Sequence, residues 1–243
     1  MDVVILCGGL GSRLGEETIL KPKPMVKIGD KPILWHIMKY YSSYGYNRFI
    51  LPVGYKAQTI INYFQNEKSD FFDTEEYNKW EVVLEDTGLN TLKGGRLKRI
   101  QKHLKTEVFH LTYGDGVCNV SIDKLLKFYK KNKRIGALTA VHPPSRFGEI
   151  KILDDQVISF NEKSQMGEGY INGGYFIFSR DIFNYVTEDE SCDFEFGPIQ
   201  RLVDENNLMA FKHESFWQCM DNIREKNYLN NLLENKVAPW VIW

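Results

Sequence analysis

The chain has 243 residues, of which 43% are hydrophobic and 26% are charged, and its formal net charge is −1. A chain of this length can bury one sizeable core, so we expect a single α/β domain. The near-neutral charge argues against a nucleic-acid-binding protein, because counterion release from phosphates requires an excess of Lys and Arg on one surface.

The sequence contains no run of about 18 apolar residues that would span a membrane. Its N-terminus enters a predicted strand directly, without the basic start and cleavage site of a signal peptide. The four cysteines form no CxxC pair, and no histidine is spaced with them as in a zinc site. We therefore expect a cytoplasmic protein with reduced thiols and no membrane association.

Short β-rich runs alternate with longer helical runs in the first part of the chain. This order is typical of a doubly wound sheet, in which ligands gather where the carboxyl ends of the strands meet the loops. The loops after the first and last of the predicted strands could therefore face one site. The strands are predicted at 3–7, 48–54, 80–86 and 108–116, and the helices at 31–45, 56–65 and 94–104.

The pattern changes after about residue 146, where short strands are joined by short polar connections. It suggests a mixed sheet laid against the first half, and the polar and aromatic stretch 65–79 is interpreted as a surface excursion. We expect a Rossmann-like doubly wound mixed sheet with helices on both faces, in one domain over 1–243. The later strands are predicted at 146–152, 157–163 and 172–178, and the later helices at 181–186, 197–206 and 223–235.

The loop CGGLGSR after the first strand combines three glycines with basic residues that follow closely. Leu14 stands where the GxGxxG fingerprint needs its third glycine, and no GK[ST] follows, so two better-known phosphate motifs are excluded. Glycines still let backbone N–H groups close on a phosphate, although a tight strand-to-helix turn is the alternative. Arg13 and Lys23 favour the phosphate site, because a forked guanidinium and a mobile ammonium suit a triphosphate. A solvated basic stretch is the alternative for Lys23 and the favoured interpretation for Lys27.

Two isolated acids stand in unusual surroundings. Asp115 lies between two glycines at the end of a predicted strand, and Asp221 lies in the segment FWQCMDN. Taken alone, Asp115 would be an ordinary turn residue. Magnesium prefers one or two carboxylates together with substrate phosphates and waters, so the two acids together suggest a shared metal ion.

The motifs GGLGSRL, KPKPM, KPILWHIMK, GYK, DTG, GGRLKR, YGDG, RFG, NEK, NGG, FWQCMD and APW occur in this order. The chain resembles the glucose-1-phosphate cytidylyltransferases, within the sugar-nucleotide pyrophosphorylase superfamily, over essentially its whole length. The resemblance implies CTP and Mg²⁺, a homo-oligomer, and transfer of CMP to a phosphorylated acceptor with release of pyrophosphate. The expected acceptor is glucose 1-phosphate, giving CDP-glucose for surface polysaccharide synthesis. It also implies a nucleotide-binding half, 1–145, and an acceptor-binding half, 146–243.

The resemblance assigns a role to each candidate site residue. Arg13 and Lys23 would be catalytic, through the leaving pyrophosphate and the charge around the α-phosphorus. Mg²⁺ would be held by Asp115 and Asp221. The acceptor would contact Glu162, Lys163, Asn172 and Gly173. The nucleotide would contact Leu6, Cys7, Gly8, Gly9, Gly11, Ser12, Arg13, Thr87, Gly88, Asn90, Gly95 and Gly114.

Several positions on the acceptor side depart from the family pattern. Ser164 and Cys219 replace prolines, and Gly197 stands where an acidic residue is usual. A pocket built to hydrogen-bond hydroxyl groups is sensitive to such changes, so phosphoglutamine or phosphocholine is an alternative acceptor. A non-catalytic nucleotide-binding regulatory module is an alternative of another class, and the absence of a DxD motif near mid-chain disfavours a glycosyltransferase. Trp217 is a candidate wall of the acceptor pocket.

Overall fold

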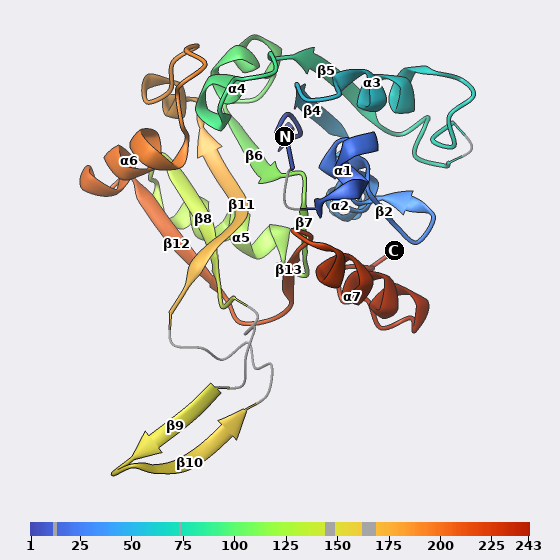
Figure 1. Ribbon diagram of the computed structural model, residues 1–243. Helices are drawn as coiled ribbons and strands as arrows, with labels where there is room; N and C mark the ends of the chain where they lie inside the picture. Colours follow the sequence, from blue (N-terminus) through green and yellow to red (C-terminus); the bar gives the residue numbers. More distant parts are fainter. Residues whose placement is uncertain (12–13, 73, 144–148, 162–168) are drawn as a thin grey trace.

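The computed structural model describes residues 1–11, 14–72, 74–143, 149–161 and 169–243 (Figure 1). Its centre is a seven-stranded sheet with the order β12-β8-β11-β6-β1-β4-β5. Neighbouring strands are parallel except β11, which runs antiparallel to both β6 and β8. The strands are β1 (Val3–Leu6), β4 (Arg48–Val53), β5 (Glu81–Asp86), β6 (Val108–Tyr113), β8 (Gly136–Val141), β11 (Ile171–Ser179) and β12 (Leu208–His213).

Helices cover both faces of this sheet, as the sequence predicted. Strand β1 shows why: Val3 and Ile5 belong to one hydrophobic cluster, and Val4 and Leu6 belong to the other. Because successive side chains of a strand point to opposite faces, a fully apolar strand must be covered on both. Residues of α2 (Ile33–Ser42), α3 (Ala57–Gln65), α5 (Ile122–Asn132) and α7 (Ile223–Glu234) pack in the first cluster, and residues of α4 (Lys93–Arg99) and α6 (Gln200–Asp204) pack in the second.

The later strands do not form a separate sheet laid against the first half. Strand β11 lies between β6 and β8 and so continues the first sheet. Its residues from Gly173 to Phe178 are buried, which requires cover on both faces. Separately, β9 (Glu149–Leu153) and β10 (Gln156–Asn161) form an antiparallel hairpin that projects from the body as an arm (Figure 1).

Several predicted helices are shorter than expected. The predicted helix 31–45 begins at Ile33, because Lys31 and Pro32 form β3 (Lys31–Pro32), which pairs with β2 (Lys27–Ile28). The predicted helix 94–104 ends at Arg99 and is followed by the 3₁₀ turn η3 (Gln101–His103). The predicted helix 181–186 is also a 3₁₀ helix, η4 (Arg180–Asn184). Among the described residues, no helix has both the length and the apolar character needed to cross a bilayer.

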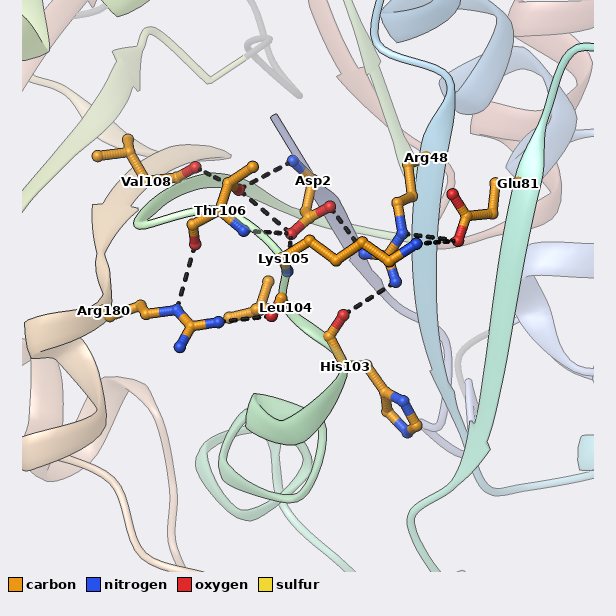
Figure 2. Close-up of polar contacts among 9 residues, drawn as sticks. All are labelled: Asp2, Arg48, Glu81, His103, Leu104, Lys105, Thr106, Val108 and Arg180. Atoms are coloured by element: carbon orange, nitrogen blue, oxygen red, sulfur yellow. Dashed lines mark hydrogen bonds and ion pairs between the residues drawn. The ribbon is translucent and has the colours of Figure 1, made fainter.

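A polar network ties together the amino ends of the parallel strands (Figure 2). The carboxylate of the buried Asp2 accepts hydrogen bonds from Arg48 Nη1 at 2.7 Å and from the backbone N–H groups of Lys105 and Thr106 at 2.6 and 3.1 Å. Arg48 also donates from Nε to Glu81 Oε1 at 2.9 Å. The network joins the starts of β1, β4, β5 and β6. The loops that build the site lie at the opposite, carboxyl edge of these strands.

Candidate active site

A cavity of about 490 Å³ opens at the carboxyl edge of β1 and β6. Both loops that the sequence singled out contribute to it, as expected for strands that end at the same edge of a sheet. Its walls also include residues from α4 and from β13 (Trp217–Cys219). The lining residues are Leu6, Cys7, Gly8, Gly9, Gly11, Lys23, Pro24, Thr91, Leu92, Lys93, Arg96, Tyr113, Gly114, Asp115, Trp217, Cys219 and Asp221.

A small two-stranded sheet brings the two predicted metal-binding acids together. Strand β7 (Gly116–Cys118) follows Asp115 directly and pairs antiparallel with β13, so that Gly116 lies opposite Cys219. The backbone N–H of Met220 donates to the carbonyl oxygen of Asp115 at 2.8 Å. Asp221 follows one residue later, and the two carboxylates therefore meet although they are far apart in the sequence.

Lys23 lies between these two carboxylates. Its Nζ is 2.6 Å from Asp115 Oδ2 and 2.5 Å from Asp221 Oδ1, and its side chain is only 10% exposed. Burial alone would lower the pKa of Lys23, but the two acids outweigh burial and raise it. Lys23 is therefore a charged ammonium at the cavity wall.

Gly11 holds the stem of Lys23 in place. Its φ of +63° is a conformation that favours glycine, and a Cβ built on it would lie 2.8 Å from the Cβ of Lys23. The 3₁₀ helix η2 (Lys23–Met25), with Pro24 in its first turn, fixes the backbone of the lysine. The glycine loop and the lysine are thus packed against each other, which their spacing in the sequence alone does not reveal.

Gly8 makes room for a second buried cation, Arg96 of α4. A Cβ on Gly8 would lie 2.1 Å from Arg96 Nη1, and one on Gly54 would lie 2.2 Å from the same atom. Arg96 Nη1 donates to Val53 O at 3.0 Å and to Thr87 Oγ1 at 2.7 Å, while Nη2 donates to Leu89 O at 3.1 Å. Arg96 therefore joins the end of β4 to the loop after β5 beneath the glycine loop.

Sequence reasoning missed Arg96, together with the neighbouring Thr91 and Lys93. The predicted contacts in this segment were Thr87, Gly88, Asn90 and Gly95, and none of these four described residues lines the cavity. The buried hydroxyl of Thr87 donates to Val53 O at 2.7 Å, so it supports the arginine from behind. A Cβ on Gly95 would lie 2.5 Å from the carbonyl oxygen of Asp189, which identifies this glycine as a close-packing residue. The paired glycines before Arg96 are the signal that could have located it, because they let α4 approach its neighbours closely.

A chain of hydrogen bonds runs from Tyr113, in the cavity wall, to the predicted acceptor contact Asn172, which like Gly173 is not among the residues that line the cavity. Asn172 Nδ2 donates to Tyr113 OH at 3.2 Å, and Tyr113 OH donates to Glu195 Oε1 at 2.7 Å. Lys93 forms an ion pair with the same Glu195 oxygen. Burial, together with Glu195, raises the pKa of Tyr113, so the phenol keeps its proton. Asn172 stands at the start of β11, which lies at this edge because β11 runs antiparallel to its neighbours.

Trp217 lines the cavity, and its role as a wall of the acceptor pocket stays a prediction. Its Nε1 donates to the carbonyl oxygen of Gly173 at 2.7 Å, which fixes the start of β11 against β13. Gly173 itself is closely packed, since a Cβ there would lie 2.8 Å from Val141 Cγ1. The predicted contacts Ser12, Arg13, Glu162 and Lys163, and also Ser164, lie outside the described residues.

The donor set suits a divalent cation that prefers oxygen ligands. Asp115 and Asp221 already share one cation, the Lys23 ammonium, through one oxygen each. The neighbouring cluster of Cys219, Asp221 and Glu225 is a poorer candidate. Burial raises the pKa of Cys219 to about 12, and Glu225 Oε2 already accepts a hydrogen bond from the backbone N–H of Asp221 at 2.5 Å.

A mixed sheet with a glycine loop, buried cations and paired acids at its carboxyl edge defines an enzyme that handles phosphates, of the nucleotidyltransferase class. The comparison with known families agrees. The chain belongs to the nucleotidyl transferase family, whose family model matches residues 2–222.

Three relatives place the chain within this family. It is 44% identical to a glucose-1-phosphate cytidylyltransferase from Salmonella typhimurium, and the alignment covers 100% of both chains. It is 36% identical to a D-glycero-alpha-D-manno-heptose 1-phosphate guanylyltransferase from Campylobacter jejuni, over 80% of this chain and 83% of the other. The crystal structure of HddC from Yersinia pseudotuberculosis complexed with GMP-PN has a TM-score of 0.70 at 27% identity, over 96% of this chain and 99% of that one.

Proposed function

We propose that this enzyme transfers the cytidylyl group of CTP to glucose 1-phosphate, giving CDP-glucose and pyrophosphate. The observation that carries the proposal is the 44% identity, over the full length of both chains, to the glucose-1-phosphate cytidylyltransferase. The cavity supports it, because it combines a glycine loop, two buried cations and two acids in a space large enough for a nucleotide.

The reaction needs positioning and charge stabilisation rather than a general base. A phosphate oxygen of the acceptor, ionised at neutral pH, attacks the α-phosphorus of CTP, and the bond from that phosphorus to the β-phosphate oxygen breaks. Pyrophosphate leaves with the electron pair of that bond. Catalysis then consists of holding the two phosphates in line and offsetting the charge that develops between them.

In this scheme the backbone of the glycine loop binds the CTP phosphates, and Lys23 offsets charge around the α-phosphorus. Arg13 is proposed for the leaving pyrophosphate. Mg²⁺, held by Asp115 and Asp221, would supply further neutralisation of phosphate charge when bound. Arg96 and the loop before α4 are proposed to hold the cytidine, with Thr87 as the internal support of Arg96.

Tyr113 and Asn172 are proposed to face the acceptor, together with Glu162 and Lys163. The hydrogen bond from Asn172 to Tyr113 and the support of Tyr113 by Glu195 would keep both groups in place. Such a pocket offers fixed polar groups to the sugar hydroxyls, and a smaller phosphate that lacks hydroxyls would leave those groups unpaired. This favours the hexose over phosphocholine or phosphoglutamine.

The test is a matrix of nucleotides and acceptors. CTP, UTP, dTTP and GTP are each incubated with glucose 1-phosphate, a heptose 1-phosphate, phosphocholine or phosphoglutamine, and pyrophosphate release is measured. The product is identified by phosphorus NMR. We expect efficient turnover only with CTP and glucose 1-phosphate, and none in the matched control Asp115→Asn. Efficient transfer to another acceptor alongside weak CDP-glucose formation would contradict the proposed acceptor, and equal rates with all triphosphates would contradict the proposed nucleotide.

Self-association is also proposed. The projecting arm exposes Leu153, Val157 and Ile158, which are 59%, 53% and 56% exposed. Neighbouring apolar side chains on one hairpin are typical of a contact surface. Light scattering coupled to gel filtration should give a mass of at least twice the 28.4 kDa of one chain, and Val157→Lys should reduce that mass; a wild-type mass of one chain would contradict self-association.

A further inference from the structure

The ammonium of Lys23 lies where a metal ion bound to Asp115 Oδ2 and Asp221 Oδ1 would lie. Nζ is within 2.6 Å of one oxygen from each acid, and the lysine side chain is largely buried. A magnesium ion lies about 2.1 Å from its carboxylate ligands. An ion bound to the same two oxygens would therefore be in contact with Nζ, and two positive charges at that separation repel strongly. Lys23 and the metal cannot use these oxygens together.

The structure limits where Lys23 can go when it leaves the acids. A Cβ built on Gly11 would lie 2.8 Å from the Cβ and 3.6 Å from the Cδ of Lys23. The part of the lysine side chain nearest the backbone is therefore held along the glycine turn. Only the end of the side chain can swing, and it swings within the cavity that Gly8, Gly9 and Gly11 line. An anion bound to this loop would be within reach of the ammonium and could form an ion pair with it.

We propose that Lys23 is an internal competitor for the metal ion and so couples metal binding to nucleotide binding. In the free enzyme the ammonium holds both acids, which weakens their affinity for a divalent cation. When nucleotide phosphates fill the glycine loop, Lys23 moves onto them and releases the acids. The identity of the anion rests on the proposed function, whereas the competition between Lys23 and the cation does not.

Coupling of this kind is reciprocal. If the nucleotide raises the affinity for the metal by releasing the acids, the metal raises the affinity for the nucleotide by the same factor. The free enzyme would then bind little metal, and a metal–nucleotide complex would bind as a unit. Two carboxylates without Lys23 would form a stronger cation site, although one less suited to the reaction.

The first experiment measures binding of Mn²⁺ alone to the protein without nucleotide, by electron paramagnetic resonance. Lys23→Met is compared with the wild type and with Lys27→Met, which also removes one positive charge but from an exposed pair with Asp70 at 3.1 Å. We expect at least tenfold tighter Mn²⁺ binding by Lys23→Met than by either of the others. Asp115→Asn should remove the binding and so identify the site. Equal affinities of the two lysine variants, or no binding by Lys23→Met, would overturn the proposal.

The second experiment follows the wild-type protein, and a variant serves only to assign the signal of Lys23. The ε-ammonium signals of ¹⁵N-labelled lysines are followed by NMR while Mg²⁺ is added without nucleotide, and Lys23 is assigned by the loss of its signal in Lys23→Gln. We expect Mg²⁺ to shift or broaden the Lys23 signal and to leave that of Lys27 unchanged. A Lys23 signal that stays unchanged at Mg²⁺ concentrations that saturate Asp115 would overturn the proposal. Neither experiment contains CTP or an acceptor, so failure of the proposed reaction is detected separately.

Discussion

Replacing Arg96 by lysine tests whether the buried guanidinium beneath the glycine loop serves the fold alone or also the nucleotide. A lysine keeps the charge and most of the stem, but it cannot span the end of β4 and the loop after β5 with two nitrogens. The structure shows which acceptors would lose their donors. Val53 O still accepts from the backbone N–H of Thr87 at 2.9 Å and from its hydroxyl at 2.7 Å. Thr87 Oγ1 and Leu89 O are the two acceptors that lose Arg96, and a single ammonium can replace the guanidinium at only one of them.

The cost therefore corresponds to about one lost charge-assisted hydrogen bond, not three. Such a loss amounts to about 2 kcal/mol of the free energy of unfolding. In a chain of this length that lowers the melting temperature by roughly 4–8 °C. Burial lowers the pKa of Arg96 because it penalises the charged guanidinium. An anion bound above Arg96 would offset this penalty. We expect Arg96→Lys to weaken the binding of a non-hydrolysable CTP analogue at least tenfold.

Arg99, one turn later on α4, provides the matched control. It donates to Thr87 O and Thr91 Oγ1 at 2.8 Å each and to Glu188 O, yet it is absent from the lining of the cavity among the described residues. Arg99→Lys should lower stability in urea titrations and leave the affinity for the CTP analogue within about twofold of the wild type. An Arg96→Lys protein that unfolds more easily but binds the analogue like the wild type would refute a role of Arg96 in nucleotide binding.

Three further predictions concern the two acids of the cavity, the recognition of the cytosine base, and the stability of the fold. Asp115→Asn and Asp221→Asn should each lower turnover by at least about 100-fold with an unchanged circular dichroism spectrum, because charge stabilisation is lost at the reacting centre; near-normal steady-state rates in both variants would exclude the metal assignment. Turnover with CTP should exceed that with UTP or dTTP by a factor that corresponds to about 1–3 kcal/mol, since an unpaired buried base edge costs that much, and competition assays with mixed nucleotides measure it. Burial opposes ionisation of Asp2, but hydrogen bonds from Arg48 and from the backbone of Lys105 and Thr106 outweigh it and lower the pKa of Asp2. A lowered pKa stabilises the fold above the ordinary pKa of 3.8 and this stabilisation is lost as the pH falls through the native value. Asp2→Asn should therefore lose about 2 kcal/mol at pH 7, as measured by urea titration, and the difference from the wild type should shrink below about pH 4; a constant difference would contradict the assignment.

The sequence by itself determined the class of the fold and one side of the site. Short apolar runs rich in β-branched residues, such as Val3–Leu6, favour strands covered on both faces, and this sheet places the loops after β1 and β6 at one edge. Glycines and charged residues at those strand ends therefore indicated Lys23, Asp115 and the glycine loop without knowledge of any contact. Their placement follows from chain order and strand direction, which are local properties.

Only the tertiary structure decided what lies opposite them. Periodicity shows that β11 is a strand but not that it enters between β6 and β8, and that insertion is what brings Asn172 to the carboxyl edge. Arg96 faces the cavity because Gly8 and Gly54 lack side chains and α4 can approach them, a fit between three separate segments. Lys23 binds both acids because β7 and β13 pair. Each of these contacts joins residues far apart in the chain, and their free energy depends on packing and charge in space, which no pattern along the sequence encodes.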